Sequence, residues 1–233
     1  MKGLVSGTLI LTLILALTLS GADARIFLNP HSIVLVFGGT LGVFLLATPV
    51  NGVTMSLRTL LGLFKPEREM REYGEQLTQL LRRKDAPVAD AHPLVAYAQE
   101  LWEKGVEKDV FRALLTRRAQ ELNGGKAQVV AALRNLAKYP PALGMTGTVI
   151  GLVSLFSHLT LDNRQALGPN LALAMTATFY GLIVANMFLM PLADRIHVLH
   201  LKSAEVHQHL IKVILMIHQG EGDSVVKDEI HAA

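Results

Sequence analysis

Four long stretches without a charged side chain constrain this chain more than any other feature. None contains Asp, Glu, Lys or Arg, and each has roughly the twenty residues that a helix needs to cross a bilayer. The core helices of soluble proteins seldom run so far without a charge. The pattern therefore predicts an all-α integral membrane protein with four spanning helices, at residues 3–20, 32–50, 141–161 and 169–192.

The first apolar run has a second interpretation. It follows Lys2 and ends near the sequence SGADA at 20–24, which resembles the small-residue cleavage site of a secretory signal peptide. The run is long for the apolar part of a signal, and another apolar run follows closely. We therefore expect a retained helix.

The distribution of basic residues predicts the orientation. Of the 22 Lys and Arg residues, 15 lie between residues 51 and 139 and four lie after residue 192. Only Arg25 and Arg164 lie in the short connections within the two pairs of spans. The positive-inside rule then places both termini and the 51–139 segment in the cytoplasm. Juxtamembrane bases account for the net charge of +3, so no nucleic acid is needed, and the absence of cysteine excludes disulfides and thiolate metal sites.

The order of apolar and polar segments predicts four regions. Proline at positions 30, 140, 141 and 169 is expected in the first turn of a span, where a missing N–H costs little. The regions are a first transmembrane hairpin at 1–50, a helical cytoplasmic domain at 51–139, a second hairpin carrying the ion path at 140–192, and a cytoplasmic tail at 193–233.

Apolar spacing within the cytoplasmic domain predicts a series of helices. Gly105 is expected to separate two of them, and the sequence NGG at 123–125 is expected to end the second of these. The expected helices are 67–84, 94–104, 107–122 and 126–138, with an apolar stripe of Leu101, Val110, Leu114 and Leu122.

The fourth span is expected to continue as a tail helix beyond a kink at Pro191 and to end at Gly220, with disorder over 221–233. Six residues mark its apolar face: Ile196, Leu199, Leu210, Val213, Ile214 and Ile217. Its histidines at 197, 200, 207, 209 and 218 include one i,i+3 pair, but no third ligand shares that face. We expect these histidines to face solvent or another subunit rather than to bind a metal.

Spans three and four each carry one threonine on a stripe of small residues. On a helical wheel, Gly144 and Gly151 share the face of Thr148, and Ala174, Gly181 and Ala185 share the face of Thr178. Thr146 and Thr176 fall on the opposite faces. Packing alone is one interpretation, because small residues bring membrane helices together and threonine can bond its own helix. The same arrangement on two helices favours a polar lining along a shared path.

The spans lack the group that an ion path needs. They contain no carboxylate and no lysine, and the only ionisable side chains near their outer ends are His31 and His158. A proton or metal ion crossing hydrocarbon needs ligands or a titrating group. The carboxylate is therefore expected from another polypeptide. No catalytic constellation is present, and the GGT at 38–40 lies within a span, where packing explains it.

Two segments resemble a known family. YPPALGMTGTVIGLV at 139–153 and GPNLALAMTATFYGLIVANMFLMPLADRI at 168–196 look like the flagellar stator A-subunit, the MotA/PomA branch of the MotA–TolQ–ExbB proton-channel family. PHSIVLVFGGTLGVFLLATP at 30–49 resembles its second span. The hairpin before the cytoplasmic domain favours the stator branch over the three-span members.

The resemblance implies an assembly in a bacterial inner membrane. Five A-type subunits form a homopentameric ring around two copies of a single-span MotB/PomB-like partner, which brings an aspartate and a periplasmic anchoring domain. Ion flow past that aspartate drives rotation, and no cofactor is implied. By position, Thr148 and Thr178 match the family's ion-path threonines and Pro169 matches the proline at the outer start of span four. The other candidate residues of the ion path are Gly144, Gly151, Ala177 and Gly181. Pro191, like Pro169, is a candidate for a role in gating or torque.

Two departures from the family pattern affect the partner and the ion. The usual charged rotor-contact helix is replaced by LLRRKDAPVADAHPLVAYAQELW, so the candidate contacts with a rotor protein are Arg82, Arg83, Lys84, Glu100 and Glu103. Sodium-type members often carry tandem threonines where this chain has Ala177-Thr178, and a threonine in place of His31, which favours protons over sodium. The alternatives are a subunit that energises another envelope process, a non-conducting scaffold, and a transporter, which would carry its own polar binding groups at mid-membrane.

Overall fold

A computed structural model describes most of the chain, and every regular element in its described part is helical. It divides into two compact units. The first unit is Met1–Thr54 with Val130–Arg195, and the second unit is Met55–Val129 with Ile196–Ala233. The described residues are 27–63, 73–74, 76–79, 91–157 and 167–231.

The first described membrane-length helix begins at a capped proline. Asn29 accepts hydrogen bonds at Oδ1 from the backbone N–H groups of His31, at 3.1 Å, and Ser32, at 3.2 Å. Pro30 needs no such acceptor, as expected for the first helical position. The helix runs through α2 (Pro30–Ile33), a π-helical turn η2 (Val34–Gly38) and α3 (Gly39–Ala47).

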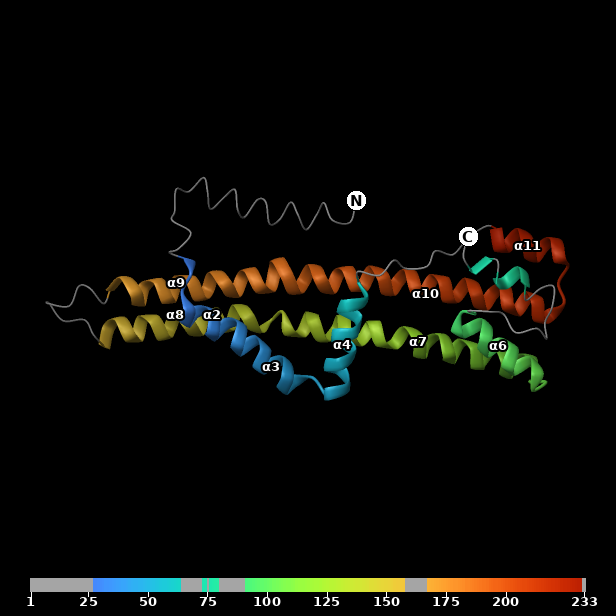
Figure 1. The fold of residues 1–233 in the computed structure, drawn as a ribbon, viewed down its shortest axis with the longest axis horizontal. Helices are drawn as coiled ribbons and strands as arrows, with labels where there is room; N and C mark the ends of the chain where they lie inside the picture. Colours follow the sequence, from blue (N-terminus) through green and yellow to red (C-terminus); the bar gives the residue numbers. More distant parts are fainter. Residues whose placement is uncertain (1–26, 64–72, 75, 80–90, 158–166, 232–233) are drawn as a thin grey trace. The chain divides into compact units, whose positions relative to one another are not determined.

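Two further helices of the first unit lie side by side (Figure 1). They are α8 (Tyr139–Ser157) and α9 (Leu167–Ile183), which place Pro140, Pro141 and Pro169 in their first turns, as expected. α9 continues through a π-helical segment η4 (Val184–Leu189) into α10 (Met190–Gln219). Pro191 cannot donate to a carbonyl one turn back, and a wide π-turn just before it is one way for a helix to accommodate that missing bond.

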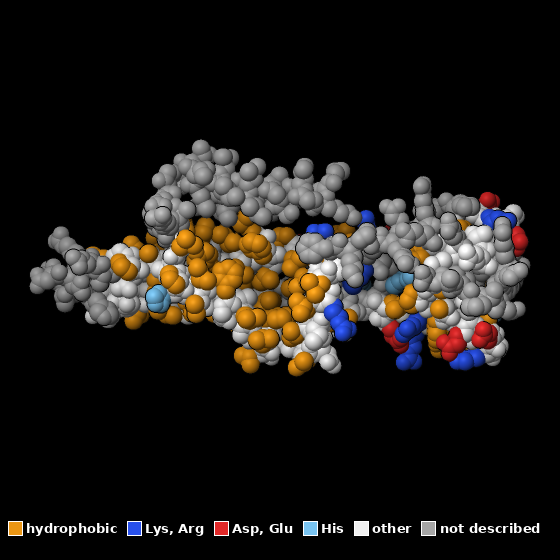
Figure 2. Space-filling view, viewed as in Figure 1, with side chains coloured by type: hydrophobic (Ala, Val, Ile, Leu, Met, Phe, Trp, Pro, Cys, Tyr) orange, Lys and Arg blue, Asp and Glu red, His pale blue; other side chains and the backbone are white. Residues whose placement is uncertain are grey.

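Three helices in the described part of the chain are long and apolar enough to cross a membrane. They match the expected spans two, three and four, although the helix of span two ends at Ala47 rather than at residue 50, and residues 158–161 of span three lie outside the described residues. The first run, at 3–20, also lies outside the described residues. Large apolar side chains cover much of the outside of the first unit (Figure 2). On α8, Met145, Val149, Val153 and Phe156 are all more than half exposed. Such a surface is suited to lipid or to another membrane helix.

The second unit has an ordinary apolar core. It contains most of α4 (Val50–Gly62), together with α6 (Pro93–Glu103), the first part of α7 (Lys108–Leu136), the later part of α10, and α11 (Asp223–His231). Gly105 at φ 62° and Gly220 at φ 72° end α6 and α10, as the sequence predicted. The largest fully buried side chains of this core are Phe111, Leu77, Leu94, Leu115, Leu210, Ile214 and Ile217.

α7 corrects two predictions. It continues through Asn123-Gly124-Gly125, where a helix end was expected. A Cβ at position 125 would come within 1.8 Å of the terminal methyl of Met55, so glycine there permits a close contact rather than a turn. The predicted stripe is correct in part, because Leu101 is buried and Leu114 and Leu122 pack against the core. Val110 is wrong, since it is 48% exposed, and Phe111, Leu115 and Ala119 form the buried row of α7. The helix is therefore rotated about its axis so that Phe111 faces the core, where its ring stacks on that of Trp102 with centroids 5.5 Å apart.

The expected disorder of the C-terminal residues is also wrong. α11 packs Val226 and Ile230, one turn apart, into the core. Glu229 of α11 forms an ion pair with Lys212, at 2.7 Å, and a hydrogen bond from that ammonium lowers the pKa of the Glu229 carboxyl. The short, charged sequence of α11 carries too few apolar residues to reveal a helix until its docking surface is known.

The tail histidines are less exposed than predicted. His207 is 5% exposed, and His218 stacks on Phe111 with ring centroids 4.4 Å apart and accepts a hydrogen bond at Nδ1 from the Trp102 indole. His209 lies 3.6 Å from Glu229. The rings of His207 and His218 are therefore part of the packing between α10 and its neighbours. Among the described residues, no three His, Cys, Asp or Glu side chains are grouped as metal ligands.

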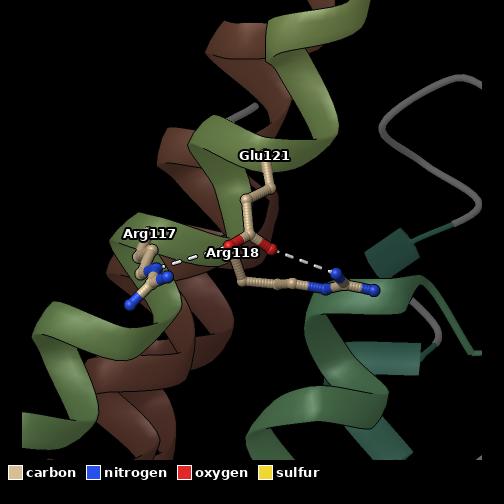
Figure 3. Close-up of polar contacts among 3 residues, drawn as sticks. All are labelled: Arg117, Arg118 and Glu121. Carbon is tan, nitrogen blue, oxygen red and sulfur yellow. Dashed lines mark hydrogen bonds and ion pairs between the residues drawn. The ribbon is translucent and has the colours of Figure 1, made fainter. Parts of the chain in front are cut away.

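Charged residues on the outside of the second unit pair with neighbours on their own helix. On α7, Glu121 accepts from Arg118 at 3.2 Å and lies 3.4 Å from Arg117 (Figure 3). On α6, Lys104 donates to Glu100 at 2.5 Å, and that hydrogen bond raises the pKa of the Lys104 ammonium. All of these side chains are more than 40% exposed. Such solvated pairs contribute little to stability.

Candidate functional site

Glycines bring the backbones of α8 and α9 into contact. A Cβ at Gly144 would lie 2.9 Å from the carbonyl oxygen of Ala177, and one at Gly151 would lie 2.7 Å from that of Asn170. A Cβ at Gly181 would lie 2.4 Å from the carbonyl oxygen of Pro140. Real Cβ atoms do not approach backbone oxygens so closely, so only glycine permits this spacing.

One contact residue of this interface was not predicted. Gly147 is buried, and a Cβ there would lie 2.3 Å from the Cβ of Ala177. Gly147 precedes Thr148, as Ala177 precedes Thr178. The true contact face of each helix therefore lies between the small residue and the threonine, and the threonines sit at its edge. The GxxGxxxG spacing of 144, 147 and 151 could have revealed this rotation.

The structure brings the two predicted threonines together. The Oγ1 atoms of Thr148 and Thr178 lie 2.6 Å apart, a hydrogen-bonding distance. Two carbonyl oxygens lie within reach of both hydroxyls: that of Gly144, at 3.1 and 3.3 Å, and that of Ala174, at 3.3 and 3.5 Å. Gly144 and Ala174, predicted on the small-residue stripes of spans three and four, thus supply the carbonyl oxygens beside the pair.

Counting protons shows what this pair can do. Each hydroxyl has one proton and two lone pairs. One proton joins the two hydroxyls and the other can go to a carbonyl, so both donors have acceptors within the pair's surroundings. Oxygen lone pairs remain, and these can accept from water or from a protonated group, or contact a cation. The site offers oxygen ligands without a formal charge.

The hydroxyl pair borders an exposed apolar face. Thr148 and Thr178 are half-buried, and the neighbouring exposed side chains on the same side are Met145 at 61% and Leu152 at 36% on α8, and Met175 at 68% on α9. On a helical wheel these residues lie within about 60° of their threonine. A helix placed against this face would therefore meet both hydroxyls.

The other two hydroxyls near this site face the N-terminal part of the first unit. Thr176 lies 2.6 Å from the Oγ of Ser32 and is 5% exposed. The hydroxyl of Tyr180 donates to the carbonyl oxygen of Phe27. The helical wheel predicts that Thr176 lies opposite Thr178, and the structure confirms this. The structure also shows a partner for Thr176, the hydroxyl of Ser32.

The other predicted residues that the structure describes lie on α2, α6, α9 and α10. Pro169 is exposed in the first turn of α9, and Pro191 is half-buried near the start of α10. Glu100 and Glu103 are exposed on α6, and His31 is exposed on α2. Arg82, Arg83, Lys84 and His158 lie outside the described residues.

Membrane-length helices joined by small residues, with uncharged hydroxyls at the edge of their contact, are the arrangement of a helical membrane protein. The family model of the MotA/TolQ/ExbB proton channel family matches residues 86–208, more than half of the chain. The chain therefore belongs to the MotA/TolQ/ExbB proton channel family. Members of this family are channel subunits, so the chain is not an enzyme.

Similar proteins come from the flagellar branch of the family. Motility protein A of Aquifex aeolicus is 30% identical over 93% of this chain and 89% of the relative. Chemotaxis protein PomA of Vibrio alginolyticus is 26% identical over 96% of this chain and 90% of the relative. A chain of the flagellar MotAB stator complex from Bacillus subtilis superposes with a TM-score of 0.83 at 21% identity, over 98% of this chain and 94% of that one. With its membrane-length helices, the chain is a protein of a bacterial inner membrane.

Proposed function

We propose that this chain is the ion-conducting subunit of a flagellar-type stator, which with a single-span partner converts ion flow into rotation. The observation that carries the proposal is the Thr148–Thr178 hydroxyl pair, 2.6 Å apart at the edge of an exposed apolar face. The relatives named Motility protein A and PomA, which align along most of the chain, support the same function.

The composition of the spans supports a partner that carries the charge. The expected spans contain no Asp, Glu, Lys or Arg, so apart from His158 near the outer end of span three they offer hydroxyl and carbonyl oxygens to an ion. An aspartate on a partner helix lying against Met145 and Met175 would sit beside both threonine hydroxyls. Each hydroxyl could then donate to the carboxylate and accept from a passing ion or water. The partner is a MotB/PomB-like protein with one span.

We further propose that five copies form a ring with the α8–α9 face inward and spans one and two towards lipid. Both termini and residues 51–139 lie in the cytoplasm, as the basic residues favour. The chain then has four functional regions: hairpins at 1–50 and 140–192, a cytoplasmic domain at 51–139 and a tail at 193–233. Gly144, Gly151, Ala177 and Gly181 shape the path, and Pro169 and Pro191 lie at the two ends of span four, where gating or torque would act.

The cytoplasmic partner and the ion complete the proposal. Arg82, Arg83, Lys84, Glu100 and Glu103 are the candidate contacts with a rotor protein. Reversing the charge of the three bases is expected to abolish torque and spare ion flow. The ion is expected to be a proton, because Ala177 replaces the first residue of a tandem threonine.

Reconstitution with the partner tests this function. The chain and its partner are placed together in vesicles, a membrane potential is applied, and ion uptake is recorded for protons and for sodium in separate runs. We expect uptake that needs both chains and is lost when the partner's intramembrane Asp is replaced by Asn. If the complex takes up ions but does not support motility in cells, the result would favour a different envelope process. If the complex assembles but takes up no ions, the result would favour a scaffold and contradict the proposal.

A further inference from the structure

The sequence places three hydroxyls within five residues of span four, at Thr176, Thr178 and Tyr180, and the structure sends them to two different sides of α9. Thr178 faces Thr148, whereas Thr176 and Tyr180 face Ser32 and Phe27. α9 is therefore held by hydrogen bonds on two sides.

We propose that the buried Ser32–Thr176 hydroxyl pair is a positioning element that fixes the rotation of α9 about its axis and so holds Thr178 in the ion path. This inference rests on the proposed function. It assigns no contact with the ion to Ser32 or Thr176, which act only through Thr178.

The Ser32–Thr176 pair is fully enclosed. Ser32 is 0% exposed and Thr176 is 5% exposed, and their Oγ atoms lie 2.6 Å apart. Ser32 Oγ also lies 3.2 Å from the carbonyl oxygen of Leu173, and Thr176 Oγ1 lies 2.6 Å from that of Ala172. One hydroxyl can thus donate its proton to the other hydroxyl, and the second hydroxyl can donate to one of these carbonyl oxygens. In hydrocarbon no water replaces a lost partner, so the pair favours one arrangement of α2 against α9.

The angle between the two threonines makes this arrangement sensitive to rotation. Residues two apart on an α-helix differ by about 200° around its axis, so Thr176 and Thr178 point to nearly opposite sides. Their hydroxyls lie roughly 5 Å from the axis, and a rotation of about 10° moves an atom at that radius by about 0.9 Å. Rotation moves the atom sideways, so a 2.6 Å contact lengthens at most to about 3.5 Å, the limit of a hydrogen bond, and by less where the contact points along the helix radius.

Other contacts hold the same side of α9. The Tyr180 hydroxyl, one turn after Thr176, donates to the carbonyl oxygen of Phe27, and the Phe179 and Phe27 rings lie 5.2 Å apart. The start of α2 is itself fixed, because the Asn29 carboxamide caps the N–H of Ser32. Ser32 therefore sits on a capped helix end and not on a free one.

The test measures ion uptake by the complete complex with its single-span partner, as a function of external proton concentration at fixed potential. We expect Thr176→Val and Ser32→Ala to raise the half-saturating proton concentration three- to tenfold, with the same amount of assembled complex. Thr176→Ser, which keeps the hydroxyl, should restore the wild-type value. The matched control is Thr40→Val, because Thr40 is also buried in the first unit and its hydroxyl donates to Val36 of its own helix at 2.5 Å.

A double-mutant comparison separates positioning from general packing. If Ser32 and Thr176 act through Thr178, Thr176→Val should change nothing further in a Thr178→Val background. An unchanged half-saturating concentration in Thr176→Val or Ser32→Ala, or a full additional effect in the Thr178→Val background, would overturn the inference. If the Thr176→Val complex fails to assemble, the half-saturating concentration of the smaller change Ser32→Ala tests the inference by itself. Absence of uptake by wild type and by Thr40→Val would instead refute the proposed function itself.

Discussion

At the interface of α8 and α9, glycine and alanine bring two backbones together, whereas the core of the second unit is filled by Phe111, Leu94, Leu115 and other large side chains. In lipid, burying a large apolar side chain gains little, because the surroundings are already apolar, and close backbone contact provides the attraction. In water, large apolar side chains supply the driving force. The α8–α9 interface should therefore be disrupted by larger side chains, whereas the core of the second unit should be destabilised by smaller ones.

The largest effect is expected from Gly181→Val. The added Cβ would lie 2.4 Å from the carbonyl oxygen of Pro140, and neither backbone can yield without separating α8 from α9. We expect loss of ion uptake and of the assembled complex, measured by uptake assays and by native mass in mild detergent. Gly42→Val is the control, since a Cβ at Gly42 meets nothing within 4 Å among the described residues. Normal uptake by Gly181→Val would show that the interface is not closely packed.

The second effect is a cavity in the second unit. Leu115 is 0% exposed, and Leu115→Ala should lower the free energy of unfolding by about 2–5 kcal/mol. Trp102, the single tryptophan, lies in this core and reports its unfolding by fluorescence. Val110→Ala, at a position 48% exposed, should change the free energy by less than about 0.5 kcal/mol. Equal effects of the two substitutions would contradict the rotation of α7 described above.

The third effect is a pH dependence confined to the second unit. Burial, with a smaller contribution from His207, lowers the pKa of His92 from 6.5 to about 4, and burial and Lys126 lower that of His207. Both histidines are neutral in the fold, so their contribution is complete above pH 6.5 and is lost as pH falls from 6.5 towards 4. Allowing for partial exposure, we expect the loss at His92 to be about 1–2 kcal/mol.

The same region supplies the variant that tests this pH dependence. The His92 ring lies 5.1 Å from the His207 ring and 5.0 Å from that of Tyr73, and its Nδ1 caps α6 by accepting from Leu94. His92→Asn keeps a good capping group and removes the titration. Acid denaturation followed by Trp102 fluorescence should therefore lose part of its slope between pH 6.5 and pH 4. An unchanged slope would place the acid-sensitive groups elsewhere.

How far the sequence could predict these regions depends on the solvent of each. Long uncharged runs predicted the membrane-length helices at 30–47, 139–157 and 167–183, because a bilayer imposes one length and one polarity. Repeated small residues indicated either close packing or a shared polar path, and the structure shows that they bring α8 and α9 into contact. The rotation was off by part of a turn, because a wheel drawn on Thr148 ignores the neighbouring Gly147.

The second unit was harder to predict from its sequence. Gly125 lies inside α7 and is in close contact with Met55, which is far away in the chain, so the sequence alone does not reveal this reason for a glycine within a helix. α11 depends on a surface made by other helices, and its own sequence has few apolar residues. The Ser32–Thr176 pair joins residues 144 positions apart, and a single sequence does not indicate such pairing.

The smallest effect is expected on the outside of the second unit. Glu121→Gln removes the carboxylate that meets Arg117 and Arg118 (Figure 3), all three of them largely solvated. The free energy of unfolding should change by no more than about 0.5 kcal/mol, less still in high salt. A change of more than about 1 kcal/mol, measured by chemical denaturation, would mean that this cluster is part of a larger network.

The most direct test of the central claim compares threonine variants in one assay. Thr148→Val and Thr178→Val keep the shape of the site and remove the hydroxyl pair, while Thr146→Val removes an exposed hydroxyl that bonds only its own helix in the described structure. A hydrogen bond to a charged group contributes about 1.5–3 kcal/mol, so ion uptake by Thr148→Val and Thr178→Val should fall roughly tenfold or more at constant complex assembly. Thr146→Val should conduct like wild type. Full uptake by the Thr148→Val, Thr178→Val double variant would contradict the account and leave the threonines a packing role alone.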